Sequence, residues 1–87
     1  MVKKQYIYFN PFTETYFFNQ SNNPRDDKRV EIRNGERAQV VNIIGKYLNL
    51  KRKSKLYVGE SVPEEIRAKI KHDFQSSRLE VEVKKGL

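Results

Sequence analysis

The chain has 87 residues, of which 37% are hydrophobic, and it carries 18 Lys and Arg against 11 Asp and Glu, for a net charge of +7. This length allows one domain and excludes a second hydrophobic core. The sequence contains no Cys, which excludes disulfides, Cys-based zinc sites and thiol chemistry, so we expect an intracellular, cytoplasmic protein. The first residues lack the long apolar run of a signal peptide or membrane span, and we expect no membrane partner.

The N-terminal segment is rich in aromatic residues, with seven of the ten in the chain lying between Tyr6 and Phe18. Residues 5–9 and 14–19 alternate around a turn that begins at Asn10, and this pattern is typical of a β-hairpin over 5–19. Residues 19–28 are polar and contain one Pro, so we expect a mobile loop there.

Residues 29–84 alternate strand and helix signals and form a predicted βαβαβ core. The signals are a strand at 29–33, a helix at 34–48, a strand at 56–58, a helix ending near 75 and a strand at 78–84. Ser61 opens a Ser-Val-Pro-Glu capping box, so its side chain is expected to cap the second helix. Gly45 is expected to permit a close approach of the first helix to the sheet.

These elements predict an α+β fold in a single domain over 1–87. We expect an open-faced two-layer sandwich, with a mixed sheet of about five strands and both helices on one face, in the order βββαβαβ. The positions expected to face the helices are Ile7, Phe9, Val30, Ile32, Leu56, Val58, Leu79, Val81 and Val83. The sequence does not decide the orientation of the second strand: either Phe17 faces inward while Tyr16 and Phe18 face outward, or the reverse holds.

The open face would carry tyrosines beside basic residues, which suits nucleic acid because rings stack on bases and cations contact phosphates. The excess of positive charge also favours a polyanionic partner. The candidate nucleic-acid-binding residues are Lys51, Arg52, Lys53 and Lys55 in a basic run, Arg25, Lys28 and Arg29 around the loop, and Tyr6, Tyr8 and Tyr16 as stacking rings. We predict nucleic-acid binding, to single-stranded or structured forms of DNA or RNA.

Other interpretations of the same residues stay open. The tyrosines could pack across strands or against the 19–28 loop, and the basic runs could be solvated loops. Alternatively, the aromatic face belongs to a protein-interaction module: a homodimer, or a compact inhibitor or adaptor of the kind that a virus or mobile element encodes. The element order differs from the βαββαβ order of the RNA-recognition fold, and the likeness to open-faced nucleic-acid binders is one of architecture.

Catalytic chemistry has little support in the sequence. His72 is the only histidine and lies beside Asp73, off the apolar stripe of its helix, so both side chains are expected to be solvated. One His without Cys cannot build a usual zinc site. We therefore expect a binding protein that is not an enzyme, with no metal, no cofactor and no small-molecule substrate.

Overall fold

A computed structural model describes residues 3–20, 23–48 and 53–87 of the chain. Its elements are β1 (Lys3–Asn10), β2 (Thr15–Asn19), β3 (Val30–Ile32), the 3-10 helix η1 (Asn34–Gln39), α1 (Val40–Tyr47), β4 (Ser54–Gly59), α2 (Glu64–Phe74) and β5 (Leu79–Lys84). The strands form one five-stranded sheet in the order β3-β2-β1-β4-β5. The predicted element order and α+β class are confirmed.

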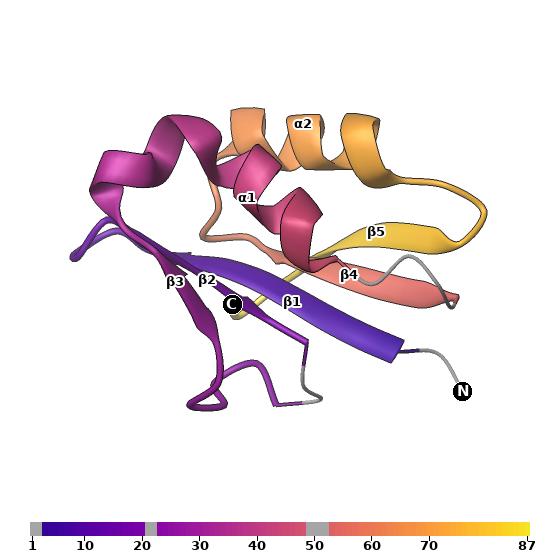
Figure 1. Ribbon diagram of the computed structural model, residues 1–87, viewed down its shortest axis with the longest axis horizontal. Coiled ribbons are helices and arrows are strands. Elements are labelled where there is room, and N and C mark those ends of the chain that lie inside the picture. Colours follow the sequence, from indigo (N-terminus) through magenta and orange to yellow (C-terminus); the bar gives the residue numbers. More distant parts are fainter. Residues whose placement is uncertain (1–2, 21–22, 49–52) are drawn as a thin grey trace.

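The sheet is mixed, with an antiparallel half and a parallel half. β1 pairs antiparallel with β2, and β2 with β3. On its other side β1 pairs parallel with β4, and β4 with β5. Both helices lie over one face of the sheet, while residues 23–28 lie on the opposite side (Figure 1). The two layers are therefore helices above and an open sheet face below.

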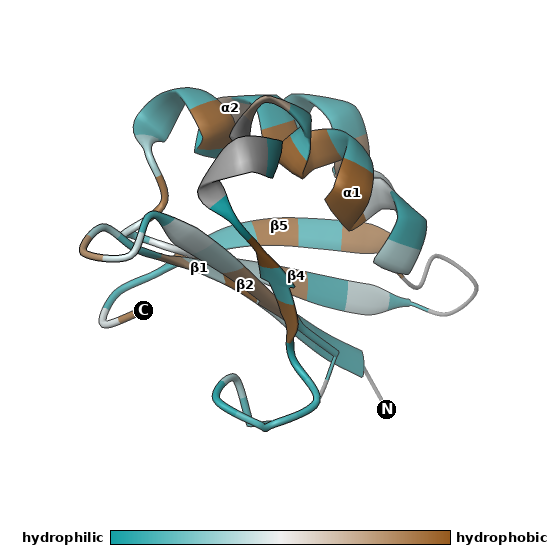
Figure 2. Cartoon of the chain, turned by 60° about the vertical axis from the view of Figure 1, so that its left-hand side comes forward, coloured by the Kyte–Doolittle hydropathy of each residue, from teal (hydrophilic) through white to brown (hydrophobic). Residues whose placement is uncertain are grey.

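The core lies between the helices and the sheet, where hydrophobic residues of both layers face one another (Figure 2). Ile44 of α1 and Ile70 of α2 are fully buried against the sheet. The strand residues of the same cluster are Ile7, Tyr16, Phe18, Ile32, Leu56, Val58, Leu79 and Val81, with Phe9 and Val30 packed against it. The predicted helix-facing positions are correct except that Val83 is 51% exposed. Val83 lies near the end of β5, an edge strand with a neighbour on one side only.

The pairing of β1 with β2 decides which way the second strand faces. Tyr16 lies opposite Phe9, and Phe18 lies opposite Ile7, so both point toward the helices. Phe17 lies opposite Tyr8 and therefore faces the open side. Residues directly opposite in a ladder share a face, and this register resolves the alternative that the sequence left open.

Two local expectations are corrected. No side-chain cap bond is present at the start of α2, and the Ser61 Oγ instead accepts the backbone N–H of Phe9 at 3.0 Å. Ser61 therefore ties the end of β1 to the segment between β4 and α2. A Cβ at Gly45 would meet the Phe74 ring at 3.3 Å, so this glycine serves the approach of α1 to α2, not to the sheet.

Candidate nucleic-acid interface

The open sheet face carries two pairs of stacked rings in adjacent cross-strand rows. Tyr8 stacks on Phe17 with ring centroids 5.1 Å apart, and Tyr6 stacks on Tyr57 at 5.3 Å. Each pair joins residues directly opposite in the ladder. Offset stacking of neighbouring rings is a favourable arrangement, and it forms a nearly continuous aromatic strip across the three central strands.

Cationic groups lie over these rings. The Arg25 guanidinium lies 5.4 Å from the centroid of Tyr8, and the Arg29 guanidinium 4.9 Å from that of Phe17. The Lys84 ammonium lies 4.8 Å from Tyr57 and 5.8 Å from Tyr6. These distances fall within the range of cation–π attraction, about 6 Å. We call this surface the basic sheet face, comprising Tyr6, Tyr8, Phe17, Tyr57, Arg25, Arg29 and Lys84.

The predicted stacking tyrosines are covered. Tyr6 and Tyr8 lie on the open face as predicted, yet they are only 4% and 5% exposed. Tyr16 is 0% exposed in the helix-facing core, so the expectation that it offers its ring to a base is corrected. The physical reason is that strand parity places Tyr16 inward, while neighbouring rings and cations cover the other two. Arg25 and Lys84 are exposed on this face, together with the acidic side chains of Glu31 and Glu82, which lie opposite Phe17 and Tyr57 in the ladders.

The segment 23–29 is held against the open face by Asn19. Its Nδ2 lies 3.0 Å from the carbonyl oxygen of Asn23 and 3.5 Å from that of Asp26. Inside the segment, the carboxylate of Asp26 accepts the backbone N–H of Lys28 at 2.9 Å. The predicted loop is therefore tied to the end of β2 through Asn23 and Asp26, and it places the Arg25 guanidinium over the Tyr8 ring.

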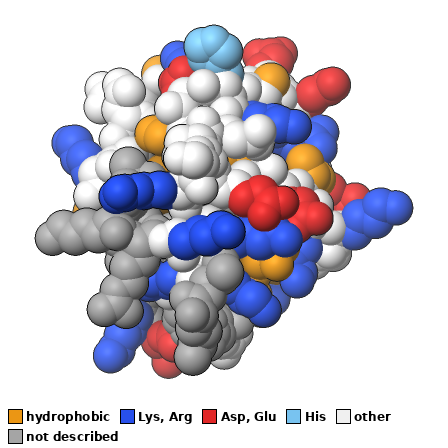
Figure 3. Space-filling view, turned by 90° about the vertical axis from the view of Figure 1, so that its right-hand side faces the viewer, with side chains coloured by type: hydrophobic (Ala, Val, Ile, Leu, Met, Phe, Trp, Pro, Cys, Tyr) orange, Lys and Arg blue, Asp and Glu red, His pale blue; other side chains and the backbone are white. Residues whose placement is uncertain are grey.

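A basic pocket opens where the parallel strands β1, β4 and β5 begin. It has a volume of about 440 Å³ and is lined by Lys4, Lys53, Ser54, Lys55, Tyr57, Ser76, Ser77, Arg78 and Glu80. We call it the strand-start pocket. Lys and Arg side chains gather at this end of the molecule, with acidic side chains beside them (Figure 3). Tyr57 belongs to the pocket and to the aromatic strip, so the two surfaces are continuous.

Lys55 is partly neutralised by an acidic neighbour. Its Nζ lies 2.8 Å from the Glu82 carboxylate, across the β4–β5 pair. The hydrogen bond to Glu82 raises the pKa of Lys55, an effect larger than the opposing desolvation. Among the described residues, Lys4, Lys53 and Arg78 form no ion pair. These three, more than Lys55, are available to an anionic ligand.

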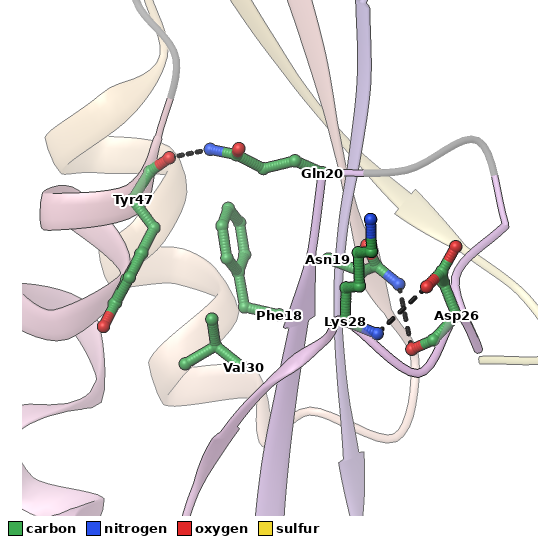
Figure 4. Close-up of a pocket in the computed structure, with 7 residues that line it drawn as sticks. All are labelled: Phe18, Asn19, Gln20, Asp26, Lys28, Val30 and Tyr47. Atoms are coloured by element: carbon green, nitrogen blue, oxygen red, sulfur yellow. Dashed lines mark hydrogen bonds between the residues drawn. The ribbon is translucent and has the colours of Figure 1, made fainter.

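A second cavity of about 330 Å³ lies between the ends of α1, β2 and β3 (Figure 4). Phe18, Val30 and Tyr47 form its apolar wall, and the Gln20 side chain spans it to donate to the Tyr47 carbonyl. Lys28 lines this cavity beside Asp26, so the structure separates Lys28 from the strand-start pocket.

The sequence-predicted cations are thus divided. Arg25 and Arg29 lie on the basic sheet face, and Lys53 and Lys55 line the strand-start pocket. Lys51 and Arg52 lie outside the described residues. Three basic residues of these surfaces were not among the predicted site residues: Lys4, Arg78 and Lys84. Lys84 lies in β5 and Arg78 directly before it, and the alternation of residues 78–84 in the sequence could have indicated both. No sequence pattern pointed to Lys4, which joins the pocket through the pairing of β1 with β4.

His72 and Asp73 contact each other on the surface of α2, with 3.0 Å between Nδ1 and Oδ1. Across residues 3–20, 23–48 and 53–87, no group of three or more His, Cys, Asp or Glu side chains could hold a metal ion. In the same part of the chain, no helix has the length and apolarity needed to cross a membrane. No protein-family model, curated protein or solved structure matches the chain significantly.

Proposed function

We propose that this protein binds nucleic acid, single-stranded or structured, by contacting its phosphate backbone through the basic sheet face. The single observation that carries the proposal is the set of cations held over the aromatic strip of an open sheet. No catalytic step is involved. An intracellular setting is part of the proposal, supported by the absence of Cys from the sequence.

The rings position the cations. A guanidinium that lies over a ring uses its face for the cation–π contact, so its N–H edge is left for phosphate oxygens. Arg25 is exposed and has this arrangement over Tyr8. Ordering a long side chain costs conformational entropy. A side chain that is already held over a ring in the free protein loses less conformational entropy when the ligand binds.

Covered rings favour binding that does not depend on base sequence. Phosphate contacts fix position and supply affinity, whereas sequence is recognised through base contacts. In this conformation Tyr6 and Tyr8 offer almost no surface to a base. We therefore expect similar affinity for oligonucleotides of different sequence, and strong dependence on salt.

The experiment is a titration of fluorescently labelled 20-nucleotide single strands, measured by anisotropy between about 50 and 200 mM salt. For single strands, log K falls by about 0.7 per phosphate contact for each unit of log salt. Lys84→Gln removes one cation from the basic sheet face and should weaken binding and flatten that slope by about 0.7. Lys69→Gln on the exposed surface of α2 makes the same change in net charge on the opposite layer.

The comparison of the two variants is decisive because their net charges are equal. A site-specific interface predicts that Lys84→Gln loses affinity while Lys69→Gln retains it. Equal losses would show that binding follows net charge alone and would remove the basic sheet face from the proposal. No binding of single strands or duplexes at about 50 mM salt would overturn the proposed function.

A second candidate is a homodimer formed along the edge strand β5, in place of the predicted interaction through the aromatic face. The observation that favours it is Val83, 51% exposed on an edge of the sheet. Antiparallel pairing with a second copy can place Val83 against Val81 and Glu80 against Lys84. The aromatic strip is less suited to a partner, since two of its four rings, Tyr6 and Tyr8, are already buried.

Sedimentation equilibrium distinguishes this candidate. A dimer that is lost on Val83→Lys would support edge pairing. A protein that stays monomeric up to about 100 µM, where a weak complex would already form, would exclude a stable dimer.

A further inference from the structure

We infer that the strand-start pocket binds a phosphomonoester group, either the 5′-phosphorylated end of a nucleic-acid strand or a free nucleotide. The inference deepens the proposed function, because a strand end is one of the two sources of that group. Three features of the pocket support it: its net charge, its hydroxyl donors and its continuity with the basic sheet face.

The charge of the pocket matches a dianion. Lys4, Lys53 and Arg78 contribute three positive charges, and Lys55 is paired with Glu82. Glu80 removes one charge, which leaves about two positive charges facing the cavity. A phosphomonoester carries about −1.5 to −2 at neutral pH. A diester linkage inside a strand carries one negative charge and would leave the pocket partly uncompensated.

The turn before β5 adds a hydroxyl donor. The Ser76 Oγ accepts the backbone N–H groups of Arg78 and Leu79, each at 3.2 Å. Both acceptor positions of that oxygen are then used, so its own O–H proton is left to donate. A phosphate oxygen is a strong acceptor for such a donor, and Ser77 lies next to it in the lining.

The position of the pocket suits the end of a strand. Its volume of about 440 Å³ falls within the usual range for ligand sites, roughly 300–1,000 Å³. Tyr57 forms the wall shared with the aromatic strip, and the Lys84 ammonium lies 4.8 Å from that ring. A strand whose terminal phosphate occupies the pocket would continue onto the basic sheet face, where Lys84 meets a following phosphate.

The test compares 12-nucleotide strands of one sequence that carry a 5′-phosphate or a 5′-hydroxyl, together with a nucleoside 5′-monophosphate and inorganic phosphate. Affinity is measured by anisotropy, and the amide signals of Ser76, Ser77 and Arg78 are followed by NMR. We expect about tenfold tighter binding of the 5′-phosphorylated strand. Shifts of those three amides should accompany it.

Variants of the lining residues test whether the preference for the 5′-phosphorylated strand comes from the strand-start pocket. Arg78→Gln and Lys53→Gln, both at exposed positions, should each reduce the preference for the phosphorylated end. Lys69→Gln on α2 should leave the preference intact. Circular dichroism spectra that match the unaltered protein show that the variants are folded.

The outcomes separate this inference from the proposed function. Equal affinity for the two strand ends, or a preference that survives both pocket variants, would overturn the pocket while leaving nucleic-acid binding in place. Binding of the mononucleotide or of phosphate at the pocket, without binding of either strand, would support the pocket with a free phosphate ester as its ligand and would overturn the proposed function. Failure of every probe would overturn both.

Discussion

The attachment of segment 23–29 to the sheet depends on Asn19, and Asn19→Ala should release it. Asn19 is buried, and its Nδ2 lies 3.0, 3.4 and 3.5 Å from the carbonyl oxygens of Asn23, Pro24 and Asp26. An amide has only two N–H donors, so these three contacts amount to one good hydrogen bond and a weaker, shared one.

The expected loss of stability follows from that geometry. One intramolecular hydrogen bond contributes about 0.5–1.5 kcal/mol net, so Asn19→Ala should lower the free energy of unfolding by about 1 kcal/mol. For a domain of this size, such a change lowers Tm by about 4–8 °C. Release of the segment should also withdraw Arg25 from Tyr8 and expose the ring, which is 5% exposed when the segment is packed.

Two measurements check this prediction. Thermal unfolding followed by circular dichroism gives the shift in Tm. Nitration of tyrosine, mapped by mass spectrometry, reports the accessibility of Tyr8, which should react in Asn19→Ala and be protected in the unaltered protein. Asn42→Ala at an exposed position of α1 is the matched control, and it should be neutral or slightly stabilising because Ala is the better helix former.

An Asn19→Ala protein that unfolds within about 1 °C of the unaltered protein, with Tyr8 still protected, would contradict this prediction. Segment 23–29 would then be held by contacts other than this amide. If Tyr8 becomes reactive and the affinity for single strands rises, the segment acts as a cover over a base-stacking ring, and stacking is worth about 1–3 kcal/mol per base.

Three further predictions follow from other contacts. Glu82→Gln removes the hydrogen bond that raises the pKa of Lys55; NMR titration should show that pKa falling toward 10.5, with tighter oligonucleotide binding. The Lys55 contact stabilises the fold at neutral pH and is lost as pH rises through the raised pKa. Gly59→Ala would place a Cβ 2.7 Å from the Leu87 carbonyl oxygen, so chemical denaturation should show a loss of about 1–3 kcal/mol. Ser61→Ala removes the acceptor of a β1 backbone N–H and should cost about 1 kcal/mol with unchanged helix content by circular dichroism.

Much of the fold could be predicted from local patterns. Alternation of apolar and polar residues placed Ile7, Leu56 and Val81 on the buried side of their strands, because successive side chains in a strand point to opposite faces. The same periodicity separated the helices from the strands and led to the βββαβαβ order. These features depend on residues within a few positions of one another, which the sequence displays directly.

The candidate site needed information that no local pattern contains. The sequence predicted that Tyr6, Tyr8 and several cations lie on the open face of the sheet. It did not predict that Tyr6 and Tyr8 are covered there. That covering comes from the stacked rings of Phe17 and Tyr57 and from Arg25 and Lys84. The two cations are distant in the chain and reach the rings through segment 23–29 and the pairing of β5. Lys4 joined the strand-start pocket for the same reason, through the pairing of β1 with β4.

The sequence by itself therefore determined the elements, their order and the buried side of most strands, since these follow from backbone periodicity and burial of apolar surface. Only the tertiary structure decided the facing of Tyr16, because three consecutive aromatic residues satisfy either side of a strand until a neighbour sets the register. It also decided which groups meet solvent on the open face. Long-range packing covered Tyr6 and Tyr8 and left Arg25 and Lys84 exposed, so of the two contacts expected from the sequence we propose phosphate contact, and not base stacking, for this surface.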